Sequence, residues 1–201
     1  MFNIHNPLER LHRRFKLIFL VGILVALLSV GFTFIFPLEY RADAQVLIIS
    51  KSNSGIDPYT LVRSAERVGD NVIQVMKTDD FYQKVKAQKN YDIDWTAFES
   101  KGEREKRKLW QKTLVPSVVY GTGVLNISTF NTNSDTAVKL AAASADALVA
   151  RGWEYVGGDV TMKVVNNPIA TRWPVRPNLV LNALLGFVVG TLLMGLLVVR
   201  K

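Results

Sequence analysis

Histidine and cysteine, which serve most often in acid–base, nucleophilic and zinc chemistry, are scarce in this 201-residue chain. The only two histidines, His5 and His12, precede the first long apolar stretch, and the chain has no cysteine. A Ser-His-Asp triad, a Cys-His pair and the usual zinc sites therefore cannot form in the region after that stretch. Disulfide bonds are excluded as well, which suits a bacterial external domain better than a eukaryotic secreted one.

Pairs of carboxylates are the remaining candidates, because two such groups can act as acid and base in sugar hydrolysis. Asp79 and Asp80 stand at a predicted helix start, where the helix dipole stabilises negative charge. Asp92 and Asp94 lack the glycine and glutamate that a calcium loop requires at fixed offsets. We therefore predict no catalytic residue, no metal site and no cofactor.

Two uncharged apolar blocks, residues 17–36 and 178–199, are the next feature to explain. About 20 residues at ~1.5 Å each cross the ~30 Å hydrocarbon core of a bilayer, so each block predicts a transmembrane helix. A cleaved signal peptide is the alternative for the first block, since Ala42-Asp43-Ala44 has the shape of a cleavage site. The block is longer than a signal-peptide core, however, and this favours a retained helix.

The net charge of +8 is spread along the chain and does not form one basic patch. Basic residues flank both apolar blocks on their terminal sides, as the positive-inside rule describes. We therefore expect cytoplasmic ends at residues 1–16 and 200–201, with residues 37–177 forming a periplasmic or external domain. The predicted partner of the two blocks is the lipid bilayer, and the pI alone does not indicate nucleic acid.

The middle region combines strand-like and helical patterns. Strands are expected at residues 40–50, 114–120, 124–130 and 159–166, and helices at residues 58–76, 78–87, 95–113 and 134–151. Gly121-Thr122-Gly123 separates two of the strands and indicates a hairpin. This order predicts an α+β domain with a small mixed sheet packed by helices, in which the first and last strands lie side by side.

Three prolines, Pro168, Pro174 and Pro177, stand within ten residues just before the second apolar block. Each fixes φ near about −65° and restrains the residue before it to extended conformations. We expect a stiff connector over residues 167–177, with Trp173 as an anchor at the membrane interface. The simpler interpretation is that the prolines only end a strand before a helix.

Small residues mark one face of each apolar block and predict close helix packing. They are Gly22, Ala26, Ser29 and Thr33 in the first block, and Gly186 and Gly190 in the second. The two helices could pair antiparallel within one subunit or between subunits. Phe187 is expected on a different face. The alternative is that glycine is simply frequent in membrane helices.

Together these features resemble the chain-length determinant proteins, the Wzz-type polysaccharide co-polymerases of bacterial inner membranes. The resemblance is carried by YRADAQVLI, by GVLNISTFNTNSDTAVKLAAASADAL, and by PIATRWPVRPN before the glycine-containing second block. It implies a ring-like homo-oligomer that works beside a membrane polymerase and the growing polysaccharide chain. It also implies a non-catalytic protein that sets the chain length of an O-antigen, capsule or exopolysaccharide.

Two departures from the family leave alternatives open. The external region is short, and the fused tyrosine kinase of the large capsule members is missing. The short form resembles adaptors that activate a separate cytoplasmic tyrosine kinase, although only two residues follow the second block. A small membrane-anchored sugar-active enzyme is the third hypothesis.

Overall fold

The computed structural model describes residues 7–50, 57–157 and 160–200. The chain divides into two compact units, one of Met1–Leu38 with Val175–Lys201 and the other of Glu39–Pro174. His5, Asp159 and Lys201, which entered the sequence-based predictions, lie outside the described residues.

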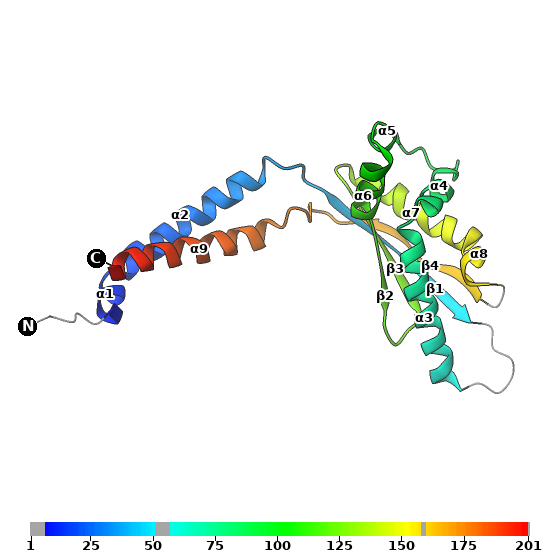
Figure 1. The fold of residues 1–201 in the computed structure, drawn as a ribbon, viewed down its shortest axis with the longest axis horizontal. Helices are drawn as coiled ribbons and strands as arrows, with labels where there is room; N and C mark the ends of the chain where they lie inside the picture. Colours follow the sequence, from blue (N-terminus) through cyan, green and yellow to red (C-terminus); the bar gives the residue numbers. More distant parts are fainter. Residues whose placement is uncertain (1–6, 51–56, 158–159, 201) are drawn as a thin grey trace, which may run out of the picture. The chain divides into compact units, whose positions relative to one another are not determined.

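The first unit is helical. Its described helices are α1 (Pro7–Arg13), α2 (Phe15–Thr33) and α9 (Leu179–Arg200). Both α2 and α9 are long and apolar enough to cross a membrane, judged by length and composition, and they lie side by side (Figure 1). The helix bounds differ by a few residues from the apolar blocks. The blocks were defined by the absence of charged residues, whereas a helix can continue through a charged residue, as α2 does at Lys16 and α9 at Arg200.

The second unit contains one four-stranded sheet among the described residues. Its strands are β1 (Tyr40–Ser50), β2 (Leu114–Val119), β3 (Val124–Asn131) and β4 (Val160–Ala170), in the order β2-β3-β1-β4. This is the split βαβ arrangement, with helices in the β1–β2 and β3–β4 connections. The predicted α+β class is confirmed, and so is the pairing of the first and last strands.

The expectation of a mixed sheet is wrong, because all three strand pairs are antiparallel. β1 and β2 run in the same direction with β3 between them, and β3 and β4 run in the same direction with β1 between them, so parallel strands are never neighbours. β2 and β3 form the predicted hairpin. Its Gly121 and Gly123 have φ of 80° and 67°, in the left-handed region that favours glycine.

Six helices complete the described part of this unit. They are α3 (Pro58–Met76), α4 (Asp79–Lys86), α5 (Thr96–Glu99), α6 (Glu103–Thr113), α7 (Ser134–Arg151) and α8 (Trp153–Val156). Side chains of Asp57, Thr78 and Asn133 cap α3, α4 and α7. The single helix expected over residues 95–113 is split into α5 and α6, because Gly102 is extended, a conformation that starts a new helix.

The core lies between the sheet and the helices α3 and α7. Ala42, Ala44, Val46 and Ile48, alternate residues of β1, are buried on this side. Alanines of α7 let that helix approach the sheet closely, and Thr129 of β3 donates a hydrogen bond to the carbonyl of α7 residue Ala137 (2.6 Å). The other residues of β1 lie on the opposite face of the sheet, which we call the open face, and are partly exposed.

β4 continues four residues past its predicted end and includes Pro168. It is an edge strand, where a proline is tolerated because one side of the strand needs no hydrogen-bonding partner. Part of the expected connector is therefore strand, and residues 171–178 lie between β4 and α9.

Candidate functional site

One carboxylate of each candidate pair, Asp80 in the first and Asp94 in the second, is engaged in local structure. The Asp80 carboxylate accepts hydrogen bonds from the Tyr155 hydroxyl and from Lys84, and these bonds lower the pKa of Asp80. Asp94 accepts from the side chain and backbone of Thr96, which lowers its pKa too. A general acid at neutral pH needs a raised pKa, so neither group is suited to that role. The described residues contain no cluster of three or more His, Cys, Asp or Glu that could hold a metal.

Lys84 ties α4 to α8 through these same groups. Its Nζ lies 2.6 Å from Glu154 Oε2 and 3.0 Å from Asp80 Oδ2, and it sits 4.1 Å from the centre of the Tyr155 ring. Desolvation lowers the pKa of Lys84, but hydrogen bonds to Glu154, Tyr155 and Asp80 outweigh it and raise the pKa overall. The Lys84 ammonium group therefore has a structural role in this cluster. Because its partners include the carboxylates of Asp80 and Glu154, the stability of the domain should depend on pH in the acid range.

We expect the Glu39–Pro174 unit to lose stability as the pH falls from about 5 to 3. A carboxylate with a lowered folded-state pKa stabilises the fold above its unfolded pKa, and this contribution disappears as the pH falls through the folded pKa. In thermal melts followed by tryptophan fluorescence, Asp80→Asn should therefore melt below wild type at pH 7, and the gap should close near pH 3. A gap of the same size at both pH values would contradict this role.

The small residues predicted to form packing faces meet between α2 and α9. Gly22 of α2 and Gly186 and Gly190 of α9 are buried at this contact. A Cβ atom added to Gly186 would lie 2.7 Å from Ser29 Cβ and 3.1 Å from Ala26 Cα. One added to Gly190 would lie 2.8 Å from Val25 Cβ. These distances are too short for a side chain, so the two backbones approach closely within one chain.

Phe187 does not lie on a separate face of α9. Its ring packs edge-on against Phe19, with centroids 5.4 Å apart. A Cβ added to Gly22 would lie 2.9 Å from Phe187 Cε2. Phe187 therefore belongs to the α2–α9 contact, because α9 rotates only ~100° between Gly186 and the next residue.

A polar network at one end of this contact was not anticipated from the sequence. Asn182 Nδ2 donates to Thr33 Oγ1 (3.0 Å), and Ser29 Oγ donates to the Asn182 carbonyl (3.0 Å). Thr33 Oγ1 in turn donates to the Ser29 carbonyl (2.8 Å). Hydrogen bonds between membrane helices specify which faces pair. The signal that could have revealed this site is the amide of Asn182 in an otherwise apolar block.

The proline segment joins the two compact units. The boundary between them falls after Pro174, and the half-buried Pro177 belongs to the helical unit. Trp173 is 73% exposed, and its role as an anchor at the membrane interface stays a prediction. That this segment transmits orientation to α9 stays a prediction.

No curated protein matches the chain. The family model described as chain length determinant protein, Wzz, matches residues 2–89. The matched range includes α1, α2, β1, α3 and α4, and it excludes the proline segment and α9. The resemblance to the chain-length determinant family is therefore confirmed over residues 2–89.

Proposed function

We infer that this chain is a non-catalytic regulator of polysaccharide chain length in a bacterial inner membrane. The observation that carries this inference is the Wzz match over residues 2–89, which supports chain-length determination in polysaccharide synthesis generally. The local hydrogen bonds of Asp80 and Asp94 also support a role without catalysis, since one carboxylate of each candidate pair stabilises the fold.

The proposed topology has two spans, α2 and α9, with both ends cytoplasmic and the Glu39–Pro174 unit outside. Few residues of either helix are buried in the structure, and four of those that are buried are glycines at or near helix contacts. The core helix of a soluble protein would be mostly buried, so lipid is the natural environment of the exposed leucine and phenylalanine side chains. Arg13, Arg14 and Lys16 at the start of α2 and Arg200 at the end of α9 favour the cytoplasmic side for both ends.

A regulator without a reacting group can act only by binding and positioning. Polymer length depends on how many additions occur before the chain is released, so a protein that changes how long the chain stays at the polymerase changes its length. A ring-like homo-oligomer beside a membrane polymerase would provide several equivalent contacts for one chain, and multivalent contact slows release. The proline connector over residues 167–177 would keep each external unit oriented relative to its α9 helix.

The test is removal of the gene followed by sizing of the surface and secreted polysaccharide on a gel. We expect the characteristic length distribution to be lost while sugar composition is retained, because the proposed role is in length and not in synthesis. Wild-type protein supplied from a plasmid should restore the distribution. An unchanged distribution and yield after deletion would contradict the proposed function.

A further inference from the structure

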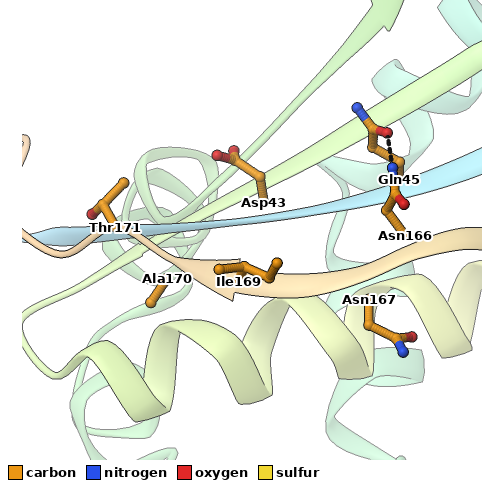
Figure 2. Close-up of a pocket in the computed structure, with 7 residues that line it drawn as sticks. All are labelled: Asp43, Gln45, Asn166, Asn167, Ile169, Ala170 and Thr171. Atoms are coloured by element: carbon orange, nitrogen blue, oxygen red, sulfur yellow. Dashed lines mark hydrogen bonds between the residues drawn. The ribbon is translucent and has the colours of Figure 1, made fainter.

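A shallow groove of about 620 Å³ lies along β1 and β4 of the external unit. Figure 2 shows its lining, in which Gln45 and Asn166 face each other from neighbouring strands. The lining residues are Asp43, Gln45, Asn166, Asn167, Ile169, Ala170 and Thr171. Five of these seven side chains carry an amide, a carboxylate or a hydroxyl. None of the seven belongs to the Lys84 cluster or to the α2–α9 contact.

An irregularity in β4 creates this arrangement. Asp43 pairs with Ile169 and Gln45 with Asn166, so β4 uses three residue steps where β1 uses two. A second shift follows, since Val46 pairs with Val164. Bulges of this kind re-aim side chains and are enriched at functional sites. Here they place the exposed Asn166 beside Gln45 on the open face.

The polar side chains continue across the sheet in register. Gln45 pairs with Asn126 of β3, which pairs with Ser117 of β2, so one row crosses all four strands. In the next row, Ser128 donates to Asp43 Oδ1 (2.6 Å), and Asn126 Nδ2 donates to Ser128 Oγ (3.2 Å). The groove therefore lies at one end of a band of polar side chains on the open face of the sheet.

The chemistry of the groove favours an uncharged, hydroxyl-rich ligand. Its one carboxylate, Asp43, is paired with Arg41 at 2.9 Å, so the site offers neither a strong negative nor a strong positive charge. The bond from Asn166 Nδ2 to Gln45 Oε1 (2.5 Å) uses one donor and one acceptor of two amides that together offer four N–H donors and four lone pairs. Sugar hydroxyls both donate and accept, and amides can satisfy both functions.

An apolar contact and the open shape complete the match. Ile169 is 76% exposed beside the amides and can cover the C–H face of a sugar ring. Because the groove is shallow, it suits a segment of a long chain better than a small molecule, which binds in deeper pockets.

We propose that this groove binds an uncharged segment of a glycan chain, with Gln45 and Asn166 hydrogen-bonding its hydroxyls and Ile169 contacting a ring face. The inference rests on the proposed function, since it identifies the growing polysaccharide as a direct ligand of the external unit. A second copy of the chain is the competing occupant of an open sheet face, and the experiment separates the two.

The probe is the surface polysaccharide of the source bacterium, stripped of lipid and cut to soluble oligosaccharides. Binding to the full-length protein in nanodiscs is measured by saturation-transfer NMR titration. We expect Gln45→Ala and Asn166→Ala each to weaken binding about fivefold to tenfold, the effect of one or two lost hydrogen bonds. The matched control is Asn90→Ala, an exposed asparagine in the turn after α4. If Gln45→Ala fails to fold, Asn166→Ala and Ile169→Ala are measured instead, because substitutions at these exposed positions should leave the fold intact.

The outcomes separate the groove from the proposed function. The proposal that the groove binds glycan is overturned if the wild-type protein does not bind the oligosaccharide, or if Asn166→Ala binds it as tightly as wild type. Either result would stand even where gene deletion still changes polysaccharide length. Tighter binding of polyanionic heparin than of the oligosaccharide would contradict the proposed uncharged ligand. If the oligomer of Asn166→Ala dissociates while glycan binding is kept, the groove contacts a second copy of the chain, and the proposal is also overturned. Weakened binding in the groove variants, together with a shifted length distribution in cells, supports it.

Discussion

Replacing Trp110 with alanine is expected to lower the free energy of unfolding of the Glu39–Pro174 unit by about 3–5 kcal/mol. The Trp110 side chain is 2% exposed, and its ring packs edge-on against Tyr82 with centroids 5.2 Å apart. Its Nε1 donates to the Met76 carbonyl (2.9 Å), which joins α6 to the end of α3. The substitution therefore leaves both a cavity and an unpaired buried carbonyl. A small domain is stable by only about 5–15 kcal/mol, so this loss is a large fraction of the total.

Two variants separate the causes of that loss. Trp110→Phe keeps one aromatic ring but removes the donor and part of the ring volume, so we expect a smaller cost of about 1–3 kcal/mol. Trp173→Ala, at an exposed position, should change stability by less than about 0.5 kcal/mol. The loss of unfolding free energy in each of the three variants is measured by denaturant unfolding of the full-length protein in nanodiscs, followed by tryptophan fluorescence. The fluorescence reports on the Glu39–Pro174 unit because all four tryptophans lie in it. Equal losses in Trp110→Ala and Trp173→Ala would show that the aromatic core is not where the stability lies.

Replacing Gly186 or Gly190 with leucine is expected to separate α2 from α9. At both positions even a Cβ would meet backbone or Cβ atoms of α2 within about 3 Å, which no rotamer change can relieve. We expect a packing cost of about 1–3 kcal/mol but normal insertion, since leucine is more apolar than glycine. The chain has no cysteine, so cross-linking between Ser29→Cys and Asn182→Cys reports the helix contact directly. Cross-linking should fall, and the polysaccharide length distribution should broaden.

The matched control is Gly31→Leu in α2. A Cβ at Gly31 meets nothing within 4 Å, so the same substitution should leave cross-linking and polymer length unchanged. Phe187→Leu is unsuitable because Phe187 packs against Phe19 at the same contact. If Gly186→Leu and Gly190→Leu behave like Gly31→Leu, the close approach of the two helices has no functional role.

The sequence was sufficient for the features that depend on local periodicity and composition. Apolar blocks of about 20 residues and the glycine hairpin after β2 each have a physical cause within a few residues. The small faces of α2 and α9 were also readable, because the helical period alone decides which residues share a face. What those faces contact could not be read from periodicity.

The tertiary structure decided which elements meet and where strands become irregular. The position of β3 between β1 and β2 made the sheet fully antiparallel, and non-local pairing of this kind leaves no local signal in the sequence. The bulges of β4 placed Asn166 beside Gln45 across 121 positions of sequence. Likewise, the Asn182–Thr33 hydrogen bond exists only because α2 and α9 pair within one chain. Contacts between distant residues depend on the register of whole elements, which is settled when the core packs.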